Sequence, residues 1–185
     1  MIKKQNPANI VSSLGDRYIA FAERLSEGTG IIAAYLLVPL VIVFLIEIIA
    51  RNLFNHPTTW AYGTCFIIGG CAAVLGFAYA LKNGVMVRID VIHSKLGEKA
   101  KCIIDMLMCL VLLFPLTVGG SYQCIKYAVL SVQASETISV GSWNAPIWPT
   151  KIVMALSFIV LTMQTFAEMI KLIKKLKTLH REAKS

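Results

Sequence analysis

The sequence predicts an all-α membrane protein with four transmembrane helices, an N-terminal amphipathic interfacial helix and both termini in the cytoplasm. The first observation behind this prediction is composition: of 185 residues, 57% are hydrophobic and 15% are charged, and the mean hydropathy is +0.70. A soluble domain of this length cannot bury so much apolar surface, so we expect lipid to cover it. The second observation is that the charges are segregated, which leaves uncharged runs at 28–46, 57–81, 106–125 and 152–167.

The first 28 residues have the pattern of an amphipathic helix on the cytoplasmic membrane surface. Its apolar residues recur at spacings of three or four: Ile10, Leu14, Tyr18, Phe21 and Leu25. Charged residues fill the other faces, which is typical of a helix that lies flat at a membrane interface. Gly28 and Gly30 follow, and we expect them to let the chain turn into the bilayer.

The four-helix transmembrane domain is expected to occupy 29–174, and a basic cytoplasmic tail to follow at 175–185. A membrane-spanning helix needs about 20 mainly apolar residues. The spans are therefore predicted at about 30–53, 59–81, 102–131 and 150–173. Pro115 is expected to bend the third span.

Lysine and arginine set the predicted orientation. Of the 18 cationic residues, only Arg51, Lys126 and Lys151 fall on the side opposite the termini. The positive-inside rule therefore places both termini and the loop between spans two and three in the cytoplasm. The net charge of +8 is thus a topology signal. Membrane phospholipids are its expected counter-charge, and no nucleic-acid partner is expected.

Polar residues inside the spans are informative because their burial in lipid is costly. Glu47 and Arg51 are four apart near the outer end of span one, so they share a helix face and can pair. Gln164 and Glu168 have the same spacing in the inner half of span four. These residues are either a proton or ion relay or polar contacts that hold helices together.

Small residues fall on one stripe of the second span. They are Gly69, Ala73, Gly76 and Ala80. Such a stripe lets another helix approach closely, backbone to backbone.

Three tryptophans and one charged pair complete the set of candidate interface residues. Trp60, Trp143 and Trp148 fall near the outer membrane interface, as an aromatic belt or as a lipid or partner site. Arg88 and Asp90 lie two apart in the inner loop. Asp90 is either the N-cap of a following helix, with Arg88 on phosphate headgroups, or part of a partner-docking site.

No constellation of residues predicts catalysis. The histidines are His56, His93 and His180, all in predicted loops or the tail, so no helix face carries a haem-binding pair. The five cysteines form no CxxC. We therefore expect no enzyme, no cofactor and no metal site.

Three stretches resemble the small membrane (Q-type) subunit of tripartite ATP-independent periplasmic (TRAP) transporters. The first is Arg51-Asn-Leu-Phe-Asn, followed by Pro57 and a Trp that opens span two. The second, at 84–90, is similar to the family's Gly-x-His-x-Arg-x-Asp, with methionine in place of the histidine. The third, at 135–151, resembles an outer loop that ends in Trp-Pro-x-Lys. Gln164 matches a recurrent polar position late in the fourth helix.

The resemblance implies a scaffold subunit of a sodium-coupled importer of organic acids in a bacterial inner membrane. A larger membrane subunit would contain the substrate and sodium sites and move like an elevator. A periplasmic binding protein would deliver the substrate. The alternative is a self-contained four-helix small-molecule or ion-coupled exporter. In the small multidrug exporters, which have four spans, the membrane-embedded Glu lies deep in span one. Glu47 instead lies near the outer end of that span.

Overall fold

The fold is a bundle of four long, antiparallel helical segments. The computed structural model describes residues 7–56, 58–84, 98–140 and 143–182. The helices are α1 (Pro7–Leu53), α2 (Ala61–Lys82), α4 (Glu98–Met108), the π-helical turn η1 (Cys109–Leu113), α5 (Phe114–Gln133) and α6 (Trp148–Glu182). Because α4, η1 and α5 form one continuous segment, these helices make four candidate spans.

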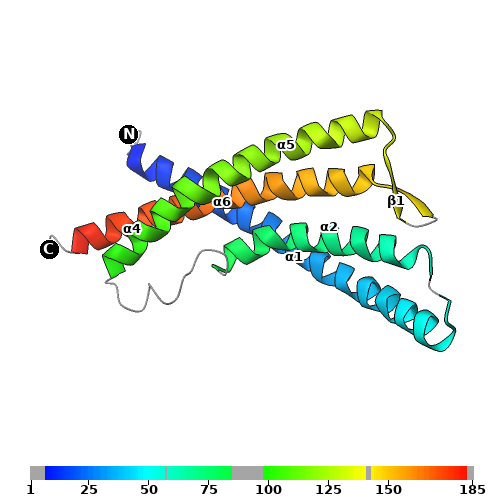
Figure 1. Ribbon diagram of the computed structural model, residues 1–185. Helices are drawn as coiled ribbons and strands as arrows, with labels where there is room; N and C mark the ends of the chain where they lie inside the picture. Colours follow the sequence, from blue (N-terminus) through cyan, green and yellow to red (C-terminus); the bar gives the residue numbers. More distant parts are fainter. Residues whose placement is uncertain (1–6, 57, 85–97, 141–142, 183–185) are drawn as a thin grey trace, which may run out of the picture.

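All four segments are long and apolar enough to cross a membrane, which confirms the predicted span count. They are Gly15–Leu53, Ala61–Lys82, Ala100–Gln133 and Trp148–Thr178. The described start of α1 and the end of α6 lie at one end of the molecule, and the α1–α2 turn and the β1 strand lie at the other (Figure 1). This arrangement agrees with two termini on one side. The side of the membrane stays a prediction.

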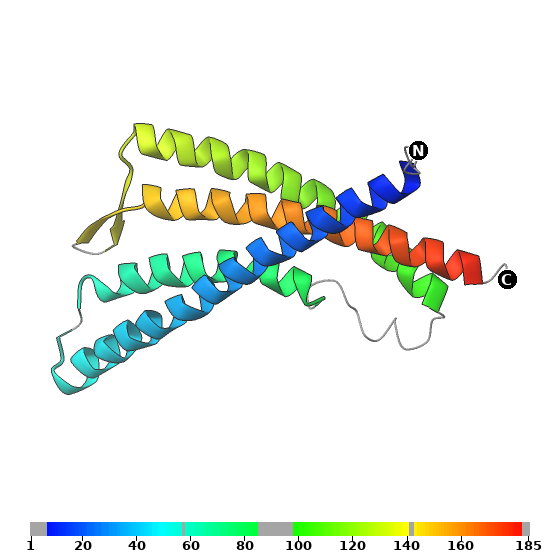
Figure 2. The ribbon, with the colours of Figure 1, turned by 180° about the vertical axis from the view of Figure 1, so that it is seen from behind.

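Helix α6 is the centre of the bundle. It packs against α1, α2, α4 and α5. In its most apolar window 33% of the residues are buried, against 6% in α1. Seen from behind, α1 crosses α6 obliquely while α2 runs beside α6 (Figure 2). The outer faces of α1 and α5 therefore carry most of the apolar surface that lipid or a partner has to cover.

The turn predicted at Gly28 and Gly30 is wrong, because α1 is one helix of 47 residues. At about 1.5 Å per residue it is about 70 Å long, roughly twice a hydrocarbon core. Gly30 has a different use: a Cβ there would lie 2.6 Å from the Tyr79 ring, so glycine permits the close crossing of α1 and α2. Placement of residues 1–28 on the membrane surface stays a prediction.

The third span widens into the π-helical turn Cys109–Leu113 directly before Pro115. Proline lacks an N–H group, and its ring clashes with the carbonyl four residues earlier. A π-turn moves that carbonyl away, so the helix accommodates Pro115 by a local widening, and the expected bend stays a prediction.

The loop between the third and fourth spans contains a two-stranded antiparallel hairpin that the sequence did not predict. Its strands are β1 (Thr137–Val140) and β2 (Trp143–Pro146), with Thr137 opposite Pro146. The Glu136 carboxylate accepts a hydrogen bond from Lys151 Nζ, and the Ile147 N–H donates to the Glu136 carbonyl at 3.1 Å. The base of the hairpin is thereby fastened to the start of α6. This loop lies outside the spans, and the Lys151 ammonium lowers the pKa of the Glu136 carboxyl.

Candidate partner and lipid interface

The end of α1 carries the first candidate site. Arg51 Nη2 donates a hydrogen bond to Glu47 Oε1 at 2.9 Å, which confirms that the two residues pair. The other carboxylate oxygen of Glu47 accepts the Thr58 backbone N–H at 3.1 Å and the Thr58 hydroxyl. Glu47 therefore fastens the turn between α1 and α2, where Asn55 has a positive φ of 49°. The Arg51 side chain stays 64% exposed.

A hollow of about 310 Å³ lies beside this pair, between α1 and α2. We call it the Arg51 groove. Its lining includes Phe44, Ile48, Arg51, Asn52, Tyr62 and Cys65. Apart from Asn52 and the Glu47–Arg51 pair, these side chains are mainly apolar. The groove therefore has a charged end and an apolar lining.

The second candidate site joins α1 to α6 through a buried amide. Gln164 is fully buried; its Oε1 accepts the Ser26 hydroxyl at 2.9 Å, and its Nε2 donates to Glu168 Oε1 at 3.0 Å. Lys171 donates to the same Glu168 oxygen at 2.7 Å and pairs with Glu23 at 2.6 Å. This chain of polar contacts fixes the crossing of the two helices.

The small stripe of α2 is open to its surroundings in the middle and touches α1 at one end. A Cβ on Gly76 would meet nothing within 4 Å, and Ala73 is exposed. A Cβ on Gly69 would make ordinary contact with Leu40 at 3.8 Å. Within the chain, α2 packs instead through a neighbouring row, in which Ala72, Leu75 and Ala78 are buried. Ala73 and Gly76 are thus open to another surface, and the role of the stripe as an interface stays a prediction.

The other candidate residues are at the ends of elements or outside the described ranges. Trp60 caps the start of α2 and Trp148 begins α6, and each is 40% exposed. Trp143 opens strand β2. Arg88 and Asp90 lie outside the described residues.

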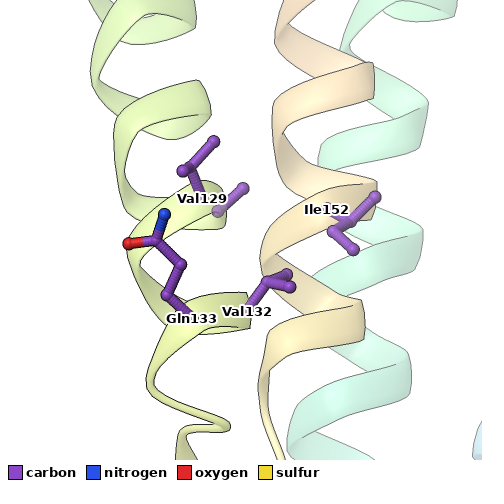
Figure 3. Close-up of a pocket in the computed structure, with 5 residues that line it drawn as sticks. Val129, Val132, Gln133 and Ile152 are labelled. Carbon is purple, nitrogen blue, oxygen red and sulfur yellow. The ribbon is translucent and has the colours of Figure 1, made fainter.

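A second hollow, of about 320 Å³, lies between the outer halves of α5 and α6. Val129 and Val132, one turn apart on α5, and Ile152 on α6 line it (Figure 3). Gln133 contributes the one polar side chain of its lining. This hollow is an open apolar depression and brings no reactive groups together.

Sequence reasoning missed the hydroxyl groups that complete these contacts. Ser26 and Thr58 supply the partners of Gln164 and Glu47. Between α5 and α6, the hydroxyls of Ser121 and Thr162 lie 2.8 Å apart, beside the Thr117 carbonyl. The available signal was that a hydroxyl inside a membrane helix needs a partner in its own or a neighbouring helix.

The fold and these contacts define a multi-pass membrane protein whose intramembrane polar groups join its own helices. Within the described ranges, no three His, Cys, Asp or Glu residues gather as metal ligands. Residues 40–175, well over half of the chain, match the family described as "Tripartite ATP-independent periplasmic transporters, DctQ component". The chain belongs to this family and is a small-subunit component of a TRAP transport system, as its sequence motifs indicated. A comparison with curated proteins gave no match.

Proposed function

We propose that this chain is the static scaffold subunit of a sodium-coupled TRAP importer of organic acids in a bacterial inner membrane. A larger membrane subunit carries the substrate and sodium sites and moves, and a periplasmic binding protein delivers the substrate. Both termini of the scaffold lie in the cytoplasm. Family membership supports the transport system, and the contacts within the chain support the static role.

One observation carries the static role: the polar side chains of the spans hold the chain's own elements together. Glu47 fastens the α1–α2 turn, and Gln164 fastens α1 to α6. Glu168 is engaged by Gln164 and Lys171. A carboxylate that relays ions has to exchange partners during the cycle, whereas these groups serve as fixed braces. We therefore favour structural contacts over an ion relay.

The small stripe of α2 is the proposed contact for the larger subunit. Its exposed Ala73 and open Gly76 leave the backbone accessible to a neighbouring helix. A leucine at Gly76 has room within this chain, so it should leave the isolated chain folded. In the complex it would hold the two helices apart and reduce recovery of the assembled transporter. Gly28→Leu, at another open helix position, is the matched control.

The test of the scaffold function is reconstitution of the chain alone and with its two partners. Sodium-driven uptake should require all three proteins. In the assembled system Glu168→Gln preserves side-chain shape and removes the charge, so the ratio of sodium to substrate should stay unchanged. Transport by the purified chain alone would favour the self-contained exporter. An altered ratio in a fully assembled Glu168→Gln complex would show that this chain handles ions.

A further inference from the structure

The Arg51 groove combines an exposed cation with an apolar channel. Arg51 has five N–H donors, and in the described part of the chain one hydrogen bond from its guanidinium is present, to Glu47. This contact restrains the guanidinium and leaves its other N–H groups available to a further acceptor. The side chain is 64% exposed and can therefore receive an acceptor from outside the chain.

The position of Arg51 along α1 matches the level of lipid headgroups. The apolar span containing it ends at Leu53, two residues further along. The turn beyond has two exposed aromatic residues, Phe54 at 74% and Trp60 at 40% exposure. Aromatic side chains gather at the boundary between acyl chains and headgroups. The Arg51 guanidinium is thus placed where phosphate groups of a leaflet lie.

The wall of the groove continues from Arg51 toward the middle of the membrane. Ile48 and Phe44 lie one and two turns before Arg51 on α1, and Tyr62 and Cys65 face them from α2. Phe44 is 57% exposed and Tyr62 is 67% exposed, so the channel opens sideways to its surroundings. Its volume of about 310 Å³ is at the low end for ligand pockets. It has room for a segment of one acyl chain and not for a whole lipid.

We propose that the Arg51 groove is a binding site for a glycerophospholipid, with Arg51 on the phosphate and one acyl chain between α1 and α2. A charged end at headgroup level, joined to an apolar channel that runs toward the bilayer centre, is complementary to this kind of amphiphile. Glu47 acts as a positioning residue that orients Arg51 and braces the turn. The assignment does not rest on the transport function, because it requires only that α1 and α2 lie in a bilayer.

The experiment is native mass spectrometry of the full chain, delipidated in mild detergent and titrated with palmitoyl-oleoyl-phosphatidylglycerol. One tightly bound lipid is expected.

Arg51→Gln removes a charge-assisted contact and should weaken the binding of this lipid about tenfold. Cys65→Phe should also weaken binding, because the larger side chain fills the channel. Arg51→Lys keeps the charge and should retain most of the affinity. Lys126→Gln removes one exposed charge from α5, outside the groove, and is the matched control; it should change affinity less than about twofold.

Several outcomes would overturn the proposal. Equal weakening by Arg51→Gln and Lys126→Gln would show a non-specific effect of charge. Binding of glycerol 3-phosphate as tightly as the lipid would show an anion site without a role for the channel. In native membranes, a photo-crosslinker at Tyr62 should capture lipid, and exclusive capture of protein would assign the groove to a partner. Circular dichroism shows whether Arg51→Gln folds. If it does not, the other two groove variants decide. Lipid binding that is lost in Cys65→Phe and kept in Arg51→Lys supports the site, and any other pattern rejects it.

Discussion

Replacing Gln164 by leucine should destabilise the junction between α1 and α6 while leaving its packing volume nearly unchanged. Gln164 is fully buried and accepts the hydroxyl of Ser26, which is also fully buried, at 2.9 Å. Leucine removes the acceptor and leaves that hydroxyl without its partner on α6. An orphaned buried donor costs about 1–3 kcal/mol. Interhelical hydrogen bonds in membranes are worth about 0.6 kcal/mol on average and up to about 1.7. We therefore expect a loss of about 1–2 kcal/mol for Gln164→Leu.

A double-mutant cycle isolates the contact itself. Ser26→Ala, Gln164→Leu and the double variant are unfolded reversibly in mixed detergent micelles, and far-ultraviolet circular dichroism follows the loss of helix. A coupling energy of about 1 kcal/mol is expected between the two sites. The control is Ser157→Ala, because this buried hydroxyl donates to the Val153 carbonyl of its own helix at 2.8 Å. Its removal leaves no donor unpaired and should cost less than Ser26→Ala.

Additive effects of Ser26→Ala and Gln164→Leu, within about 0.3 kcal/mol, would refute the reasoning. The same conclusion would follow if Gln164→Leu were as stable as the natural chain. Either result would mean that packing alone fixes the crossing of α1 and α6. The description of the intramembrane polar groups as braces would then lose its main support.

Three further predictions concern packing, pH and topology. Gly120→Ala should destabilise the chain by about 1–3 kcal/mol, because its Cβ would lie 2.6 Å from the Phe158 ring. The control is Gly28→Ala, which has nothing within 4 Å of its Cβ and should be neutral or stabilising. Equal melting temperatures for the two variants would contradict this prediction. Lys151 lowers the pKa of Glu136 below its ordinary 4.5, so the pair stabilises the hairpin above that pH, and this contribution is lost as the pH falls below it. Protection of the β1 amides from hydrogen exchange should therefore decrease below that pH. Glu136→Gln should abolish this dependence of protection on pH. A reporter at the C-terminus should be cytoplasmic and one in the hairpin at 141–142 periplasmic; reporters on one side would overturn the topology.

Local spacing predicted those contacts that lie within one helix. Glu47 with Arg51 and Gln164 with Glu168 each lie four residues apart, and the helical repeat brings such pairs together whatever the rest of the fold does. The number of spans and the end of the first span at Leu53 also followed from the sequence, because membrane thickness sets the minimum length of a spanning helix. The start of the first span did not follow, because α1 begins at Pro7.

Contacts between helices were not predictable from local patterns. The partner of Gln164 is 138 residues away in the chain, and finding Ser26 requires the crossing point of α1 and α6. Gly30 was assigned to a turn because an isolated glycine has the same sequence signature in a break and in a close helix crossing. The packing row of α2, with Ala72, Leu75 and Ala78, differs from its small stripe, and the rotation of the helix that selects this row depends on the neighbouring helices. The hairpin was missed because its short strands carry little alternation.

The central position of α6 has a consequence for biogenesis. Helix α6 leaves the ribosome after the other three spans, yet it packs against α1, α2, α4 and α5. The α1–α2 hairpin can form early from its own contacts, but the hydroxyl of Ser26 has no α6 acceptor until Gln164 is synthesised. The three earlier spans therefore have surfaces that stay exposed to lipid until α6 is synthesised. A chain that ends before α6 should consequently be recognised by membrane quality control and degraded as an orphan, however well its first three spans insert.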